Sequence, residues 1–91
     1  RMSRIEIRHA HALAPSEARK VAEELAKTLA ERFGIDYAWQ GDVLNFSRPG
    51  VDGAIELGKT ALTVQAKLGF LAAMFKDKIE AEIQRVLDER F

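Results

Sequence analysis

The stretch that decides the fold spans residues 35–67 and reads IDYAWQGDVLNFSRPGVDGAIELGKTALTVQAK. Apolar and polar residues alternate along it, as in Ile35, Tyr37 and Trp39, and this period of two is typical of strands with one buried face. Short turn sequences divide the stretch into four strands: Gly41-Asp42, Pro49-Gly50 and Gly58-Lys59. Because short connections join antiparallel neighbours, the stretch predicts a four-stranded meander.

One further strand and two helices are predicted on either side of the meander. Over residues 3–9, Ile5 and Ile7 alternate with charged residues, and this alternation predicts a half-buried strand. After Pro15, apolar residues spaced by three and four predict a helix that ends before Gly34. A second helix is predicted from about 68–70 almost to the end of the chain. Its apolar stripe is Leu68, Leu71, Ala72, Phe75, Ile79, Ile83, Val86 and Leu87.

The element order β-α-β-β-β-β-α predicts an α+β fold. We expect a five-stranded antiparallel sheet in the spatial order 1-5-4-3-2, with both helices on its apolar face in a miniature helix-grip-like arrangement. A chain of 91 residues suits a single domain, assigned here to residues 2–91, with Met2 as the natural start and Arg1 as a cloning remnant. The predicted core comprises Val21, Leu25, Leu29, Trp39, Phe46, Ile55, Val64, Ile79 and Ile83.

Composition limits the classes of function. Lysine and arginine number 14, as do aspartate and glutamate, so no net field attracts nucleic acid. The absence of cysteine excludes disulfides, thiolate catalysis and zinc–thiolate sites. No stretch approaches 18 apolar residues, and the N-terminus lacks the apolar segment of a signal peptide, so neither a transmembrane helix nor a signal peptide is predicted.

The histidine pair is the first candidate for chemistry. His9 and His11 would share a face if the first strand continued that far, which is a usable spacing for two metal ligands. A closed site needs further ligands, and a histidine base needs a nucleophile that the sequence does not identify. Two solvated histidines at a strand end are therefore the favoured interpretation, and we predict no tightly bound metal, no cofactor and no catalytic residues.

A ligand pocket between the sheet and the helices is the second candidate. Tyr37 and Trp39 could form one wall of it, although burial in the core is the simpler interpretation for Trp39. Arg48 falls in phase with Leu44 at a strand end, where it could bind a carboxylate or phosphate or else extend into solvent. Together with Phe75, these residues define a possible pocket for an apolar ligand.

An apolar interaction patch is the third candidate. Phe70, Ala73 and Met74 lie off the predicted apolar stripe of the last helix. Either the fold buries the first turns of this helix on all sides, or these residues form an exposed patch for a partner, a second subunit or a hydrophobic surface. A homodimer is the simplest way to cover such a patch.

Read in order, nearly the full chain resembles a family of small bacterial proteins, the polyhydroxyalkanoic acid system or granule-region proteins. No single piece is specific, and the resemblance rests on order and spacing. The matching pieces are Ile5-Glu-Ile-Arg-His9, Ala18, Trp39-Gln-Gly-Asp42, Leu44, Phe46, Gly50-Val-Asp-Gly53, Leu62-Thr-Val64, Leu68-Gly69, Ile79 and Ile83.

The resemblance implies a cytoplasmic setting at the storage granules of the polyester polyhydroxyalkanoate, and it brings no catalytic residues. We therefore expect a non-catalytic accessory protein that contacts the granule surface or other proteins. The alternative is a small domain that binds an apolar ligand, such as an acyl group, between the C-terminal helix and the sheet. An enzyme ranks third.

Overall fold

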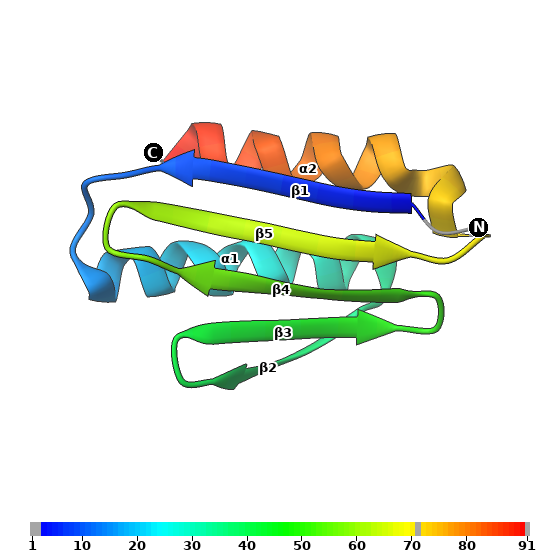
Figure 1. The fold of residues 1–91 in the computed structure, drawn as a ribbon, viewed down its shortest axis with the longest axis horizontal. Coiled ribbons are helices and arrows are strands. Elements are labelled where there is room, and N and C mark those ends of the chain that lie inside the picture. The colour runs from blue at the N-terminus through cyan, green and yellow to red at the C-terminus, as the bar shows by residue number, and fades with distance from the viewer. Residues whose placement is uncertain (1–2, 71, 91) are drawn as a thin grey trace.

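The computed structural model describes residues 3–70 and 72–90 of the chain. Within these ranges the chain forms a sheet and two helices joined by short connections (Figure 1). The elements are β1 (Ser3–Ala10), α1 (Pro15–Phe33), β2 (Asp36–Gln40), β3 (Val43–Arg48), β4 (Val51–Leu57), β5 (Ala61–Leu68), a 3₁₀-helix η1 (Ala72–Phe75) and α2 (Lys76–Arg90).

The sheet has five antiparallel strands in the order β1-β5-β4-β3-β2, which confirms the predicted topology. Both helices lie behind the sheet in Figure 1, with α2 near β1 and α1 near β4 and β3. The fold is therefore a two-layer α+β arrangement with one sheet face under the helices.

Strand register places the predicted apolar positions on the helix-covered face. One row across the sheet runs through Ile7, Val64, Ile55, Leu44 and Trp39. The positions between them point to the opposite face, because successive side chains alternate along a strand, and most of these are polar. Eight of the nine predicted core residues are buried: Val21, Leu25, Leu29, Phe46, Ile55, Val64, Ile79 and Ile83. The ninth, Trp39, is only partly buried and packs against the edge of this core.

Helix α1 has the predicted ends. Pro15 occupies the first turn, where a missing N–H costs no hydrogen bond. Gly34 adopts a left-handed conformation with φ of 67°, and its N–H donates to the Ala30 carbonyl at 2.9 Å. Ala26, which lies outside the predicted stripe, is also buried. Ala26 lies on the same side of α1 as Glu23, whose carboxylate contacts Trp39 on β2. The edge strand β2 therefore covers this side of α1, and the buried surface of the helix is wider than the predicted stripe.

The predicted start of the last helix is wrong. Leu68 is the last residue of β5, where it pairs with Ser3 and Val51, so the strand alternation continues past the expected boundary. The chain then turns at Gly69, whose N–H donates to the Gly50 carbonyl at 2.7 Å. One turn of 3₁₀-helix precedes α2, which begins at Lys76. Leu71, which was assigned to the apolar stripe, lies outside the described residues.

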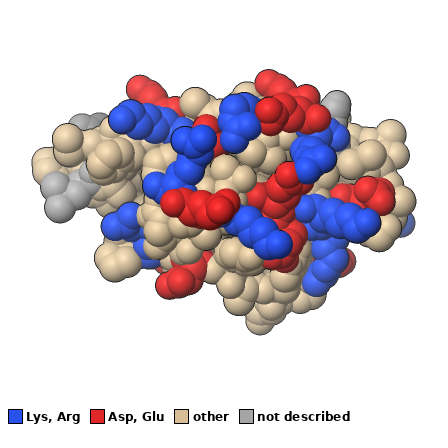
Figure 2. Space-filling model, turned by 180° about the vertical axis from the view of Figure 1, so that it is seen from behind, with Lys and Arg blue, Asp and Glu red and all other residues tan. Residues whose placement is uncertain are grey.

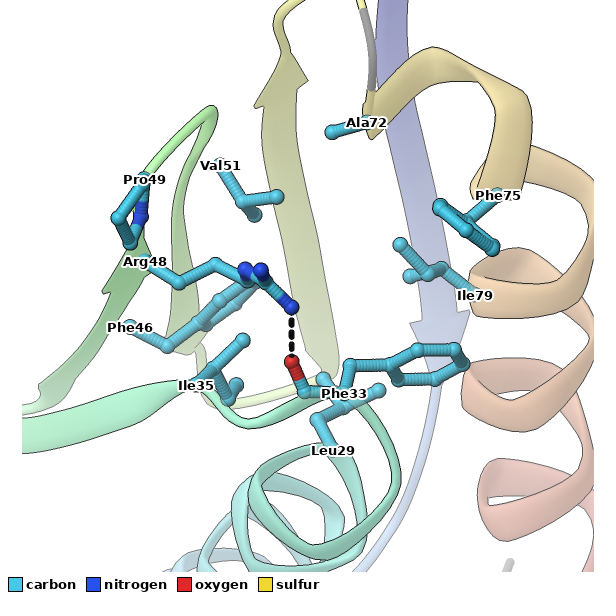
Figure 3. Close-up of a pocket in the computed structure, with 10 residues that line it drawn as sticks. All are labelled: Leu29, Phe33, Ile35, Phe46, Arg48, Pro49, Val51, Ala72, Phe75 and Ile79. Carbon is cyan, nitrogen blue, oxygen red and sulfur yellow. Dashed lines mark hydrogen bonds between the residues drawn. The ribbon is translucent and has the colours of Figure 1, made fainter.

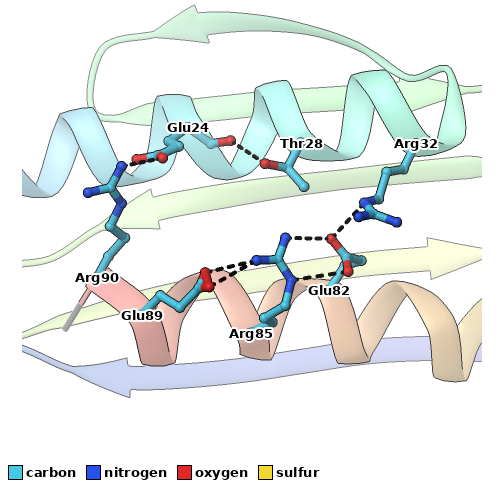
Figure 4. A network of polar contacts seen from close by, with 7 residues as sticks. All are labelled: Glu24, Thr28, Arg32, Glu82, Arg85, Glu89 and Arg90. Atoms are coloured by element: carbon cyan, nitrogen blue, oxygen red, sulfur yellow. Dashed lines mark hydrogen bonds and ion pairs between the residues drawn. The ribbon is translucent and has the colours of Figure 1, made fainter.

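Ion pairs connect the outer faces of the antiparallel helices (Figure 4). Arg32 on α1 contacts Glu82 on α2, with Nε and Oε2 3.1 Å apart, and Arg90 contacts Glu24 near the other end of the pair. Arg85 donates to both carboxylate oxygens of Glu82, at 2.9 and 3.2 Å. These hydrogen bonds, together with the charge of Arg32, lower the pKa of Glu82.

Candidate functional site

A cavity of about 310 Å³ opens at the end of the molecule where α1 ends and α2 begins (Figure 3). Most of its lining is apolar and comes from both helices, η1, the ends of β3 and β4 and the connection between α1 and β2. The lining residues are Leu29, Phe33, Ile35, Phe46, Arg48, Pro49, Val51, Ala72, Phe75 and Ile79. Its volume lies at the lower end of the range of about 300–1,000 Å³ that is usual for small-molecule sites.

Arg48 supplies the positive charge of the cavity. It is the last residue of β3, on the same side of the sheet as Phe46, and its aliphatic stem runs along the lining. Its Nη1 donates a hydrogen bond to the Phe33 carbonyl at the C-terminal end of α1, where a cation is favourable. Arg48 thus combines features of both predicted alternatives. Its guanidinium group lies at the exposed rim, and its aliphatic stem lines the apolar cavity.

The structure divides the predicted pocket residues between two places. Arg48 and Phe75 line the cavity, but Tyr37 and Trp39 do not. The Trp39 indole Nε1 donates to the Glu23 carboxylate at 2.6 Å, and the Arg19 guanidinium stacks 3.9 Å from the centre of the indole ring. The Tyr37–Trp39 side of the predicted pocket thus lies against α1, apart from this cavity. An indole N–H needs a hydrogen-bond acceptor when it is partly buried, and that acceptor comes from α1.

Hydrogen bonding alters the pKa values at this contact between α1 and β2. The bond from Trp39, followed by that from the Tyr37 hydroxyl, lowers the pKa of Glu23, and Lys27 and Arg19 add to the effect. The same Glu23 carboxylate raises the pKa of Tyr37, because it accepts the hydroxyl proton and repels a phenolate. Both shifts favour the charged carboxylate and neutral phenol, the state in which the edge strand is held on the helix.

Exposed apolar side chains cluster in the connection between β5 and α2. The exposed fractions of Phe70, Met74 and Phe75 are 75%, 79% and 49%. Among the described residues, these three are the exposed large hydrophobic side chains, and Phe75 is exposed over about half of its surface. Of the two alternatives considered from the sequence, exposure describes Phe70 and Met74. Ala73 is partly buried and packs against the core, and Phe75 is more exposed than its predicted place on the stripe implied.

Charge is distributed unevenly over the helix-bearing face. Basic and acidic groups alternate over its middle, while the described residues at the left end of the view in Figure 2 are mostly uncharged. Figure 2 is turned by 180°, so this end is the one at which η1 lies in Figure 1, and Ala72 and Phe75 of η1 line the cavity. The exposed apolar side chains and the cavity therefore lie at the same end of the molecule, and Phe75 belongs to both.

The two histidines lie at the opposite end of β1 from the cavity. His9 pairs with Leu62 in the sheet. The strand ends at Ala10, but the His11 N–H still donates to the Thr60 carbonyl at 2.9 Å, and His11 Nδ1 accepts from the Leu13 N–H at 3.1 Å. Within residues 3–70 and 72–90, no group of three or more histidine or acidic side chains could hold a metal ion.

Several cavity residues carry no signal in the sequence beyond that of an ordinary buried face. Phe33, Val51 and Ile79 carry the strand or helix period that marks any buried face. The cavity forms where the end of α1, the turn after β3 and the start of α2 come together. The periodicity of one helix or strand does not indicate which other elements its end will meet. Arg48 was the available signal, since it is a charged residue on an apolar phase.

Comparisons with known proteins identify a family. The model of the family described as "Putative polyhydroxyalkanoic acid system protein" matches residues 5–91. Searches of curated proteins and of solved structures gave no match. In the part of the chain that the structure describes, no helix is long and apolar enough to cross a membrane. Since the match spans nearly the whole chain, the protein belongs to the polyhydroxyalkanoic acid system protein family.

Proposed function

We propose that this protein is a non-catalytic accessory protein that attaches to the surface of polyhydroxyalkanoate granules through Phe70 and Met74. The observation that carries the proposal is the exposure of these two side chains, at 75% and 79%. Exposed apolar patches of this kind mark contacts with partners or hydrophobic surfaces. Membership of the family supports the granule as the apolar surface, and attachment there would place the protein in the cytoplasm.

The chemistry of this segment suits a water–polyester boundary. No charged residue occurs between Lys67 and Lys76, so the connection can leave water without burying an ion. Methionine adapts to an irregular surface because its side chain is unbranched and flexible. The two-layer domain supports the connection on one side, where Ala72 and Ala73 pack against the core, so attachment does not require unfolding.

The test is co-sedimentation with isolated polyester granules. The variant Phe70→Glu, Met74→Glu should lose most granule binding, while its denaturation midpoint stays close to that of the parent because both side chains are exposed. The matched control is Gln40→Glu, Thr60→Glu, which adds the same charge at exposed sites elsewhere. Parental binding by the Phe70/Met74 variant would refute the proposal.

A second copy of the chain is the competing occupant of this surface. Sedimentation velocity separates the two cases, because a homodimer would dissociate in the Phe70→Glu, Met74→Glu variant without granules being present. A parent protein that is monomeric in solution and binds granules supports the proposal. A stable parent dimer that fails to bind granules would refute the proposal and assign this surface to a homodimer contact.

A further inference from the structure

We infer that the cavity at the Arg48 end of the fold binds the alkyl chain of a fatty carboxylate, with the Arg48 guanidinium holding the carboxylate at the rim. This site is separate from the proposed granule contact through Phe70 and Met74. The ligand class follows from two features of the cavity, an apolar interior and a single cationic side chain at its edge.

The interior selects an alkyl chain. Leu29 and Ile79 are nearly fully buried, with exposed fractions of 2% and 6%, and they form part of the floor between the helices. Phe33 and Phe75 flank the opposite side of the opening from Arg48 (Figure 3). A hollow of about 310 Å³ can take a medium-length chain, and each methylene group that enters it leaves water favourably, by about 0.8 kcal/mol.

The rim selects an anion. A guanidinium has five N–H donors, and Arg48 uses one of them on the Phe33 carbonyl. Within the described ranges, Arg48 forms no ion pair with a carboxylate of the protein, whereas Arg19, Arg32, Arg85 and Arg90 each do. The bond to Phe33 fixes the side chain in place, so the remaining donors are oriented before a ligand arrives. A guanidinium fork suits a carboxylate group.

The test uses sodium decanoate below its micellar concentration, with binding followed by NMR chemical shifts of backbone amides. In the parent protein we expect saturable shifts centred on Phe33, Arg48, Val51 and Ile79. Butyrate should bind at least tenfold more weakly than decanoate because its alkyl chain is short. Decanol should also bind at least tenfold more weakly than decanoate because it lacks the negative charge. Absence of saturable shifts with decanoate, or shifts centred elsewhere, would overturn the inference.

Two variants separate the roles of the rim and the interior. Arg48→Gln should weaken decanoate binding at least tenfold, and Arg48→Lys should restore part of it. Arg8→Gln, which removes the same charge from the exposed face of β1, should leave binding unchanged. Equal affinity of the parent and Arg48→Gln for decanoate would refute the role of Arg48.

Filling the cavity tests the interior. Ala72 lines it, and Ala72→Leu places extra carbon atoms in the hollow (Figure 3). This variant should lose decanoate binding while keeping its denaturation midpoint; undiminished binding would show that decanoate lies elsewhere. The Phe70→Glu, Met74→Glu variant should still bind decanoate, so failure of granule attachment and failure of ligand binding are distinguishable.

Discussion

Gly53 on β4 lies directly opposite Phe46 on β3, and the Phe46 ring occupies the space that a side chain on residue 53 would need. A Cβ atom on Gly53 would come within 2.4 Å of Phe46 Cζ and within 2.6 Å of the Gln65 carbonyl oxygen. Both residues are on the helix-covered face. The missing side chain therefore lets an aromatic ring lie flat against the sheet beside the cavity.

The first prediction concerns this contact. Gly53→Ala should lower the free energy of unfolding by about 1–3 kcal/mol, as overpacking of a core commonly does. The double variant Gly53→Ala, Phe46→Leu should show a favourable coupling energy in a double-mutant cycle, since the smaller side chain removes the closest clash. Rescue should be partial because the Gln65 carbonyl remains in place. Additive effects in urea denaturation would contradict the assigned contact.

The second prediction concerns the core under α1. Leu25 is fully buried, so Leu25→Ala should cost about 2–5 kcal/mol. That is a large share of the 5–15 kcal/mol by which small domains are usually stable. Lys27→Ala, at an exposed position two residues later on the same helix, is the control and should change the urea midpoint little. Equal midpoints for the two variants would show that Leu25 is not core.

The third prediction concerns pH. Because the pKa of Glu23 is lowered in the folded state, the charged carboxylate stabilises the fold. This contribution is present above the ordinary pKa of about 4.3 for glutamate and is lost as pH falls through the lower folded-state value. The single tryptophan, Trp39, donates to Glu23, so its fluorescence should report the titration.

The variant Glu23→Gln keeps an acceptor for the indole but removes the titrating group. We expect the acid-induced change in Trp39 emission to disappear in this variant while the parent shows it below about pH 4.3. Glu31→Gln, on an exposed position of the same helix, is the matched control and should behave like the parent. A fluorescence titration that persists in Glu23→Gln would assign the change to another group.

The fourth prediction concerns the contact between the helices. Glu82 accepts from Arg85 and pairs with Arg32, so Glu82→Gln should lower the thermal midpoint. Added salt should narrow the difference from the parent, because salt screens the charges near the surface. Glu89→Gln removes a carboxylate that Arg85 contacts within α2 alone, and it should have the smaller effect. The reverse order would argue against the inter-helix role of Glu82.

Periodicity predicted the sheet because each strand repeats a short pattern, and Ile55 or Val64 needs no distant information to be assigned to a face. It failed at Leu68, where an apolar residue continues the strand alternation and also fits the first turn of a helix. It failed at Trp39 because the acceptor for its N–H, Glu23, comes from another element. The cavity was only half predicted, through Arg48 and Phe75, because its other residues look like ordinary core in the sequence.

The strand pairing of Ser3 with Leu68 determines where a reporter can be attached. Ser3 pairs with Leu68 at the end of β5, and Phe70 follows Leu68 by two residues, whereas Arg90 lies beside Glu24 at the far end of the helices. In Figure 1 the start of β1 and η1 share one end of the molecule, and α2 finishes at the other. A fluorescent protein fused before Ser3 would crowd the apolar side chains and mask attachment in imaging, so labels for microscopy belong after Arg90.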